Sequence, residues 1–368
     1  MKVLLLGEYS NVHRTLAEGL RLLGHSVTVA SDGDSWKNYP RDIDLCRRSV
    51  GKADTLDFLV RLAKALPRMR GYDVVQLINP VFLELRPEKL LPIYRYLRRY
   101  NGKIFLGAFG MDHYWVKTGL DRCTFRYSDF NIGQEIRMNA DNKKFIAEWL
   151  NGPKGRLNTY IADNCDGIVS GLYEYDASYR PWYPEKTHFI PFPVNLDKIS
   201  PRVPHPETDR IRFFIGIQRD RNVYKGTDIM YKALVQLATQ YPERIEIVKA
   251  ESVPFAQYSR MMDSSDVLLD QLYSYTPAMN ALLAMAKGLV VVGGGEEEHY
   301  ALLNEKELRP IVNVYPSAED VYAKLEELIN HPDDIIWRSA ESMEYVLRHH
   351  EYRKVAEQYV DCWDGKKV

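Results

Sequence analysis

The sequence has little cysteine and no paired cysteine motif. Its four cysteines, Cys46, Cys123, Cys165 and Cys362, are far apart in a chain of 368 residues. Without a CxxC pair we expect neither a zinc ribbon nor a disulfide framework, but reduced thiols in a cytosolic protein. The sequence also has no uncharged run of about 18 residues, which excludes a membrane-spanning helix. The apolar run at its start is too short for a signal peptide.

No charge of one sign dominates the chain. Its 49 lysines and arginines face 50 aspartates and glutamates, so the formal net charge is -1. This balance disfavours a globally basic nucleic-acid-binding protein. Apolar residues make up 45% of the chain and charged residues 27%, which is the ordinary balance of a globular protein. A chain of this length holds two or three domains, each with its own core.

Several common site motifs are also missing. The first expected strand is followed by GEYSNVH at residues 7–13, not by the GxGxxG of a dinucleotide-binding turn. There is no GxxxxGK[ST], HExxH or GxSxG sequence, so a P-loop, a zinc-protease helix and a hydrolase elbow have no anchor. Two DxD tripeptides, 32–34 and 42–44, are of the kind that holds Mg²⁺ against a diphosphate. Both lie in a polar stretch, and we expect solvated loops and no metal site.

What the sequence does contain is an alternation of short apolar runs and amphipathic helical stretches. The near-continuous apolar character of the runs is typical of parallel strands that are covered on both faces. Between the first two runs, apolar residues at helical spacing predict a helix. In the first half we expect strands at residues 3–6, 27–30, 74–78, 104–107 and 168–170.

The same pattern restarts after a proline-bearing stretch at residues 200–209, which predicts a linker. We expect a second set of strands at residues 212–216, 245–249, 267–270, 289–292 and 311–314. Two α/β domains follow from this repetition. We assign them residues 1–200 and 209–340, with C-terminal helices at residues 341–368 that cross back to the first domain.

The strongest functional signal follows the first strand of the second half. Residues 214–228 read FIGIQRDRNVYKGTD. A strand ends at a glycine, a short loop presents Arg219 and Arg221, and Lys225 precedes the next helix. Ligands of open α/β sheets bind at the carboxyl ends of the strands, and guanidinium and ammonium groups bind phosphate oxygens. We therefore predict a diphosphate site at these three residues.

A second signal lies in residues 270–292, DQLYSYTPAMNALLAMAKGLVVV. Thr276 suits a helix N-cap, and the proline after it suits the first helical position. Free backbone N–H groups at such an N-terminus form an anion site. Thr276 is therefore a further candidate for binding the diphosphate.

Together these segments resemble the retaining glycosyltransferases of the GT-B group, family 4 in particular. The resemblance rests on Arg219 or Arg221 with the KG of residues 225–226, on LAMAKGLVV at residues 283–291, and on IPFPV at residues 190–194. It implies two Rossmann-like parallel-sheet domains that face each other across a cleft. It also implies a nucleotide-diphosphate sugar as co-substrate, no further cofactor, and metal-independent transfer with retention of configuration.

The chain departs from this family at one place. The family usually has two glutamates eight positions apart, and the aligned residues here are Tyr275 and Leu283. We place the donor sugar or ribose near Tyr275 and Asn280, and by spacing the acidic residues 296–298 are not at this site. The departure leaves two alternatives open, a catalytically inactive sugar-nucleotide-binding or partner protein and a nucleotide-sugar 2-epimerase.

By the same resemblance, the first domain binds the acceptor. Glu8, Tyr9 and His13 follow the first strand, where this fold brings a loop to the cleft. GAFGMDHYW at residues 107–115 resembles the Gly-x-Asp segment that many of these enzymes place at the acceptor side. This implies Asp112 as a catalytic carboxylate and His113 as an acceptor-side residue.

We therefore expect a glycosyltransferase that moves a sugar from a nucleotide-diphosphate sugar to a glycan or lipid-linked acceptor, in polysaccharide biosynthesis. Residues 1–100 hold 17 lysines and arginines against 11 aspartates and glutamates. This local excess predicts a cytoplasmic protein that contacts the inner face of a membrane through basic helix faces such as Arg61, Lys64 and Arg68. The alternative is a solvated helix face. We expect no nucleic-acid partner.

Overall fold

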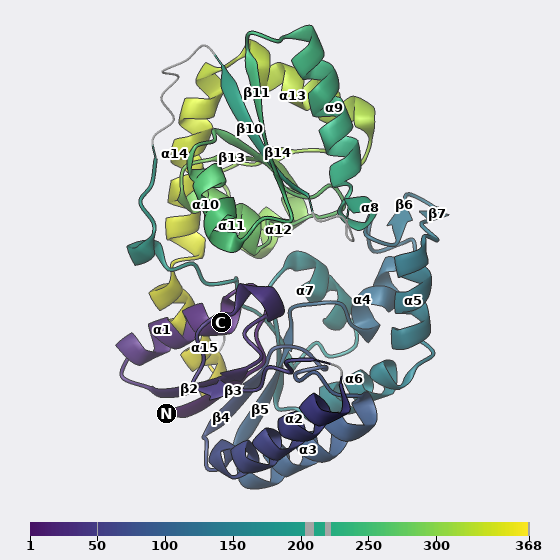
Figure 1. The fold of residues 1–368 in the computed structure, drawn as a ribbon, viewed down its shortest axis with the longest axis vertical. Coiled ribbons are helices and arrows are strands. Elements are labelled where there is room, and N and C mark those ends of the chain that lie inside the picture. Colours follow the sequence, from purple (N-terminus) through teal and green to yellow (C-terminus); the bar gives the residue numbers. More distant parts are fainter. Residues whose placement is uncertain (50, 203–209, 218–221, 367–368) are drawn as a thin grey trace. The chain divides into compact units, whose positions relative to one another are not determined.

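The protein is described from a computed structural model, which places residues 1–49, 51–202, 210–217 and 222–366. Most of the linker expected at residues 200–209 lies outside these described residues, as do Arg219 and Arg221. The chain divides into two compact units (Figure 1). The first comprises Met1–Asp121, Asn139–Pro193 and Tyr352–Val368, and the second comprises Arg122–Met138 and Val194–Glu351.

The first unit contains a sheet of seven strands in the order β3-β2-β1-β4-β5-β8-β9, and all neighbouring pairs are parallel. The chain runs outward from β1 through β2 and β3 and then returns to the other side of β1 with β4. Ligands of such sheets bind outside the carboxyl ends of the strands at this reversal. The strands are β1 (Lys2–Leu6), β2 (Ser26–Ser31), β3 (Ile43–Asp44), β4 (Val74–Leu77), β5 (Lys103–Ala108), β8 (Gly167–Ser170) and β9 (Thr187–Phe189).

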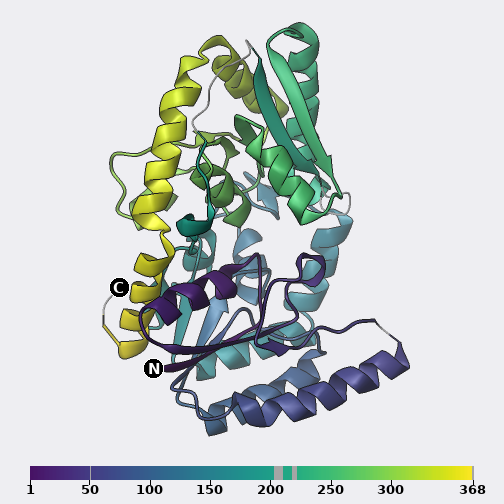
Figure 2. The same ribbon diagram turned by 60° about the vertical axis from the view of Figure 1, so that its left-hand side comes forward.

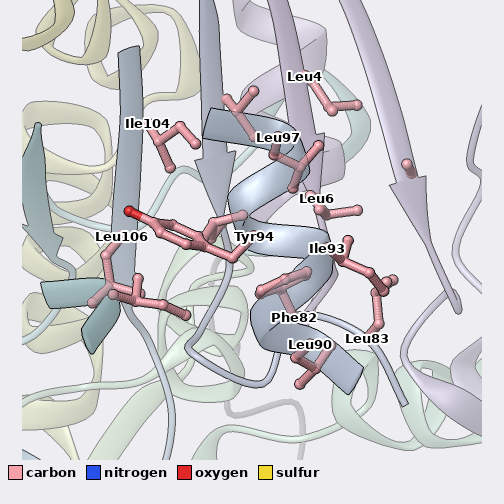
Figure 3. Packing of buried hydrophobic residues seen from close by; sticks show 14 of the residues in the cluster. Leu4, Leu6, Phe82, Leu83, Leu90, Ile93, Tyr94, Leu97, Ile104 and Leu106 are labelled. Atoms are coloured by element: carbon pink, nitrogen blue, oxygen red, sulfur yellow. The ribbon is translucent and has the colours of Figure 1, made fainter. Parts of the chain in front are cut away.

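Helices cover one face of this sheet with a continuous apolar core. Figure 3 shows Leu97 of helix α3 between the strand residues Leu4 and Ile104. Leu90 of the same helix lies beside Phe82. Apolar residues recur along α3 at helical spacing, which gives it one buried side. The helices of the first unit are α1 (Val12–Leu22), α2 (Lys52–Ala65), α3 (Pro87–Tyr100), α4 (His113–Gly119), α5 (Ala140–Trp149), α6 (Pro153–Asn164), α7 (Tyr173–Tyr179) and α15 (Tyr352–Asp364).

The C-terminal helix α15 covers the opposite face together with α1. Gly19 of α1 lies where the two helices meet, because a Cβ atom there would overlap the carbonyl oxygen of Tyr352. Trp363 of α15 contacts the ring of Phe105 in β5, with ring centroids 6.4 Å apart. Phe105 alternates with strand residues that face α3, so its side chain lies on the other side of the sheet. Cover on both faces explains why these strands are apolar throughout.

The second unit repeats the plan with five parallel strands in the order β11-β10-β12-β13-β14, and here the order reverses between β10 and β12. The strands are β10 (Ile211–Ile217), β11 (Ile245–Glu251), β12 (Val267–Leu269), β13 (Val290–Gly293) and β14 (Val312–Asn313). The helices are α8 (Asn222–Lys225), α9 (Thr227–Gln240), α10 (Phe255–Asp263), α11 (Met279–Ala286), α12 (Glu297–Leu302), α13 (Ala318–Asn330) and α14 (Asp333–His349).

Residues 122–138 belong to the second unit although the chain on both sides of them belongs to the first. They contain an antiparallel pair of short strands, β6 (Asn131–Ile132) and β7 (Glu135–Ile136). We call this segment the inserted hairpin (Figure 1). From the sequence, all of residues 1–200 were predicted to form one domain. Nothing local in the hairpin indicates that it packs on residues about 150 positions further along the chain.

The start of α11 and the lengths of the helices test two predictions made from the sequence. Helix α11 begins at Met279 with Ala278 as its N-cap, so Thr276 does not cap it as predicted. The loop continues for two more residues because Ser274 and Thr276 hydrogen-bond each other instead. Among the helices of the described residues, none combines the length and apolar character that crossing a bilayer requires.

Candidate functional site

In the second unit, polar side chains gather where β10 and β12 end. Asp270 follows β12 directly and accepts a hydrogen bond from the Asn280 amide nitrogen at 2.8 Å. The Tyr258 hydroxyl donates to the amide oxygen of Asn280 at 3.0 Å. Tyr258 lies against Gly216 of β10, since a Cβ atom on that glycine would contact its hydroxyl at 2.6 Å. The side chain of Asn280 is therefore held at both ends beside the strand reversal.

Lys225, the last residue of α8, lies at the same edge. Its carbonyl oxygen accepts the backbone N–H of Leu272 at 2.9 Å, which ties α8 to the loop after β12. Burial raises the pKa of Asp270, whereas the positive charge of Lys225 and the hydrogen bond from Asn280 lower it. Of the three basic residues predicted to bind a diphosphate, only Lys225 is described, and it is close enough to act on Asp270.

The loop after β12 also positions Tyr275 and Thr276. Thr276 is buried, and its carbonyl oxygen accepts the Ser274 hydroxyl at 2.7 Å. The carbonyl oxygen of Tyr275 accepts the backbone N–H of Glu296 at 3.1 Å. A Cβ atom on Gly294 would overlap the carbonyl oxygen of Ser274, so only glycine allows the loops after β12 and β13 to approach this closely. Spacing along the chain had excluded Glu296 from this region, whereas the structure brings Glu296 beside Tyr275.

One end of the inserted hairpin is anchored on this acidic residue. Arg126 pairs with Glu296, with an Nη2–Oε2 distance of 2.7 Å, and also with Glu298. The Tyr127 hydroxyl donates to the other oxygen of Glu296. The backbone N–H of Arg126 donates to the Tyr275 hydroxyl at 2.7 Å, and the rings of Tyr127 and Tyr275 lie 4.9 Å apart. Tyr275 is buried beneath the hairpin.

The other end of the hairpin is anchored beside Lys225. Arg137 lies over the ring of Tyr273, with its guanidinium carbon 3.4 Å from the ring centroid, and donates to the carbonyl oxygen of Val223 at 3.0 Å. The Tyr224 hydroxyl donates to Asp129 at 2.6 Å. The hairpin therefore contacts α8 and the loops after β12 and β13, which also carry Lys225, Tyr275 and Glu296.

In the first unit, Glu8 and His13 form a buried pair after β1. The Glu8 carboxylate accepts the backbone N–H groups of His13 at 3.2 Å and Arg14 at 2.8 Å, which are donors at the start of α1. Burial raises the pKa of Glu8 to about 8, although these two hydrogen bonds oppose the shift. Burial lowers the pKa of His13 to about 3, so its imidazole is neutral.

The tautomer of His13 follows from its one hydrogen bond. Its Nδ1 lies 2.8 Å from the carbonyl oxygen of Gly7, and because a carbonyl oxygen only accepts, Nδ1 carries the proton. Its Nε2 is buried and has no hydrogen-bond partner among the described residues. The structure therefore brings together Glu8 and His13, which were both predicted to lie on the acceptor side. The Nε2 atom of His13 can accept a further hydrogen bond.

Tyr9 connects this pair to the end of β5. A Cβ atom on Gly110 would lie 2.9 Å from the Tyr9 ring, so the ring covers that glycine. The next residue, Ser10, donates its backbone N–H to Asp34 at 2.8 Å, and Lys37 pairs with the same carboxylate at 2.6 Å. The loops after β1, β2 and β5 thus converge at one edge.

Asp112 occupies a different place. It is fully buried and caps α4 by accepting the backbone N–H of Trp115 at 2.9 Å. Its other oxygen accepts the Tyr179 hydroxyl at 2.7 Å, and Asn158 donates to that hydroxyl at 3.0 Å. Burial raises the pKa of Asp112 to about 7 against these bonds. The geometry fits a residue that positions α4, and contact with a substrate stays a prediction.

His113, the first residue of α4, belongs to the same structural group. Its backbone N–H donates to the side-chain oxygen of Asn158 at 2.9 Å. Its ring Nδ1 lies 2.9 Å from the carbonyl oxygen of Trp149. The ring is thereby fixed against the end of α5, and its predicted acceptor contact is not tested by this arrangement.

The two DxD tripeptides have protein partners. Asp34 binds Lys37 and the Ser10 backbone, and Asp42 accepts from the Val29 backbone at 2.8 Å and from Arg21 at 2.7 Å. In the described part of the chain, no group of three or more histidine, cysteine, aspartate or glutamate side chains is placed to hold a metal ion. Metal independence itself stays a prediction.

The sequence did not predict a role for Asp270, Tyr258 or the inserted hairpin, and spacing had excluded Glu296. Asp270 carried a local signal, a carboxylate directly after a buried strand, which is the usual position of a site residue in open α/β sheets. The other three carried none, because each reaches the site through contacts between residues far apart in the chain.

Comparison with known proteins connects this geometry to a class of enzymes. Residues 217–361, which include most of the second unit, match the model of a family described as glycosyl transferase-like. No curated protein matches the sequence significantly. The family match confirms the glycosyltransferase class that the sequence predicted.

Solved structures match over nearly the whole chain at low sequence identity. Sucrose-phosphate synthase from Thermosynechococcus elongatus is 14% identical, with 99% of each chain covered and a TM-score of 0.64. HepE from Anabaena, in complex with UDP-glucose, is 11% identical, with 99% of this chain and 100% of that chain covered and a TM-score of 0.62. The catalytic domain of starch synthase IV from Arabidopsis thaliana, bound to ADP and acarbose, is 11% identical, with 99% and 98% covered and a TM-score of 0.57. At these identities the likeness shows the fold, and it confirms the expected GT-B fold.

Proposed function

Because this chain is a glycosyltransferase of the GT-B fold, we propose that its second unit binds a nucleotide-diphosphate sugar at the carboxyl edge of the five-stranded sheet. The observation that carries the proposal is the polar group of Lys225, Asp270 and Asn280 at the strand reversal. The nucleotides named with two structural neighbours, UDP-glucose with HepE and ADP with starch synthase IV, support this ligand class.

Lys225 is the residue we assign to the diphosphate. Its compact positive charge stabilises the negative charge that builds up on the leaving diphosphate when the bond to the sugar breaks. The half-buried N-terminus of α11 adds oriented backbone N–H groups near Asn280. Arg219 and Arg221 remain candidates by sequence. This arrangement supports transfer that needs no metal ion and no further cofactor.

For the donor sugar or ribose we propose contacts from Glu296, with Tyr275 and Asn280. Each oxygen of Glu296 accepts one protein hydrogen bond, from Tyr127 or from Arg126. A carboxylate has about four lone-pair sites, so it retains capacity for sugar hydroxyls. Arg126 fixes the orientation of this carboxylate. We infer that Glu296 supplies an acidic group where the aligned position holds Tyr275.

The acceptor, a glycan or a lipid-linked sugar, is proposed to bind the first unit at Glu8, Tyr9 and His13. With its pKa near 8, Glu8 is largely protonated at neutral pH, so it is a hydrogen-bond donor there. His13 Nε2 is a hydrogen-bond acceptor that has no partner among the described residues. Asp112 and His113 would act through the position of α4. We expect retention of the anomeric configuration by resemblance to the family.

The cellular setting is also a proposal. None of the four cysteines is in a disulfide, which fits a reducing compartment such as the cytoplasm. The basic excess of the first 100 residues supports peripheral contact of the first unit with a membrane surface, where a lipid-linked acceptor would be found.

The donor site is tested by calorimetric titration of UDP, GDP and ADP, with and without EDTA, followed by transfer assays with the corresponding sugars. We expect Lys225→Ala to weaken nucleotide binding about tenfold to a hundredfold, since a hydrogen bond to a charged group contributes about 1.5–3 kcal/mol. Lys232→Ala is the matched control, because Lys232 is exposed on α9.

Three outcomes would decide against parts of this proposal. No affinity for any nucleotide would reject the donor site, and affinity that EDTA abolishes would reject metal independence. Binding without transfer to any acceptor would favour the inactive sugar-nucleotide-binding protein that the missing glutamates leave open.

A further inference from the structure

Helix α2 has two sets of apolar side chains, of which one packs against the first unit and the other is exposed. Phe58, Leu62 and Ala65 are buried against the first unit. On the remaining surface of the helix, the exposed fractions are 65% for Leu56, 46% for Leu59 and 44% for Val60. Positions three and four apart lie side by side on a helix, so these three side chains form one exposed apolar patch.

Such a patch differs from ordinary surface exposure. Single exposed leucines are common in soluble proteins, but adjacent ones on one helix face indicate a contact surface. Figure 2 shows α2 along the outer edge of the first unit. Of the basic residues predicted to share a face here, Lys64 and Arg68 are exposed, whereas Arg61 is half-buried and pairs with Asp57 at 2.8 Å. The apolar patch therefore lies at the centre of the exposed side of α2.

Positive charge surrounds this apolar centre. Lys52 precedes Leu56 by four residues and Lys64 follows Val60 by four, so an exposed lysine lies one turn beyond each end of the patch. Residues 47–70 hold seven lysines and arginines and two aspartates. Both aspartates have partners, since Asp57 pairs with Arg61 and Asp54 accepts the Ser49 hydroxyl. The net field around the patch is therefore positive.

We propose that α2 docks on an anionic phospholipid surface, with Leu56, Leu59 and Val60 in the interfacial region and Lys52 and Lys64 at the headgroups. An apolar stripe flanked by lysines suits a helix that lies in the plane of the interface. The long lysine side chains reach the headgroups while their stems stay beside the apolar residues. This inference rests on the proposed membrane contact, which it assigns to a specific helix, and it is independent of the donor site.

The test is co-sedimentation with vesicles of phosphatidylcholine alone or with added phosphatidylglycerol. We expect the protein to bind only the anionic vesicles, and binding to weaken as salt screens the lysines. The double variant L56E/V60E should reduce the bound fraction at least about tenfold. L347E is the matched control, because Leu347 on α14 is also 46% exposed and should leave binding unchanged.

Folding and donor binding are checked in the same samples. Because the substituted residues are exposed, circular dichroism and nucleotide affinity should match the parent protein, which separates failure of this inference from failure of the donor site. A parent protein that ignores anionic vesicles, or a double variant that binds like the parent, overturns the inference. So does a dimer that L56E/V60E dissociates, because a second copy would then occupy the patch.

Discussion

At the scale of single residues, the end of β1 holds a carboxyl group and an imidazole whose uncharged forms are both favoured by burial. Burial disfavours charge, so it raises the pKa of Glu8 and favours its protonated form. For the same reason it lowers the pKa of His13 and favours the neutral imidazole. In the proposed acceptor site, this uncharged pair would hydrogen-bond to sugar hydroxyl groups. It also makes the stability of the first unit depend on pH.

The two pH effects have opposite signs. Glu8 has an ordinary pKa of 4.5 and a folded pKa of about 8, so between these values the folded state binds more protons and stability falls as pH rises. His13 has an ordinary pKa of 6.5 and a folded pKa of about 3, so between these values stability rises with pH. The effects cancel from about pH 4.5 to 6.5, and Glu8 alone acts from about pH 6.5 to 8.

We therefore predict that the free energy of unfolding of the first unit decreases from pH 6.5 to 8, by at most about 1.4 kcal/mol per pH unit. Glu8→Gln should flatten this decrease, because an amide does not ionise, with a loss of about 1 kcal/mol at pH 6 for the weaker cap. Urea denaturation across this range measures both. A slope that Glu8→Gln leaves unchanged would show that another group titrates.

A second residue-scale prediction concerns Asp112. Asp112→Ala removes a helix cap worth about 1 kcal/mol and leaves the buried Tyr179 hydroxyl without its acceptor, at about 1–3 kcal/mol. We expect a total loss of roughly 2–4 kcal/mol in denaturation experiments. Tyr179→Phe, which removes only the hydroxyl, should lose less. If Asp112→Ala abolished transfer in a fully stable protein, a direct catalytic role would be established.

At the scale of elements, the local pattern of apolar residues predicts the strands of both sheets. It predicts much less of the candidate site. The strands at residues 3–6 and 212–216 were predictable because continuous apolar runs between helical stretches fit buried parallel strands. A local cap also explains where α13 begins, since the Ser317 hydroxyl accepts the N–H of Asp320 at 3.1 Å. The start of α11 was wrong by two residues, because a loop bond between Ser274 and Thr276 competes with the cap.

The inserted hairpin shows why the rest of the site could not be predicted. Its strands have two residues each, too few for any alternation to appear. Its partners, such as Tyr275 and Glu296, lie about 150 to 170 residues further along the chain. Spacing within a motif therefore excluded Glu296, whereas tertiary contacts bring it beside Tyr127 and Tyr275.

This contact leads to a prediction with a built-in control, because Arg126 pairs with two glutamates. If Glu296 contacts the donor sugar, Glu296→Gln should raise the KM for the nucleotide sugar at least about tenfold, with a smaller effect on the affinity for the free nucleotide diphosphate. Glu298→Gln removes the other partner of Arg126 and should have a much smaller effect. Equal effects of the two variants would mean that the carboxylates only anchor the hairpin.

At the scale of the whole molecule, each of the two units contains an apolar cluster of its own. One cluster lies within the first unit and includes residues of β1, β4, β5 and α3, and the other includes residues of β10, β12 and α9 in the second unit. Among the described residues, the two clusters have no member in common. The first unit depends on both ends of the chain, since α1 and the C-terminal helix α15 pack on each other.

We predict that each unit can be destabilised without the other. In Gly19→Ala the new methyl group overlaps the Tyr352 carbonyl oxygen, and because this atom is backbone it cannot move aside as a side chain would, so α1 and α15 should separate at a loss of about 1–3 kcal/mol. Leu237→Ala empties part of the second core at about 2–5 kcal/mol. Hydrogen exchange read by mass spectrometry should show faster exchange in β1 and β5 for the first variant and in β10 and β12 for the second. If either variant accelerated exchange equally in both sheets, the two cores would unfold as one cooperative unit, and the division of the chain into two independently stabilised units would have to be given up.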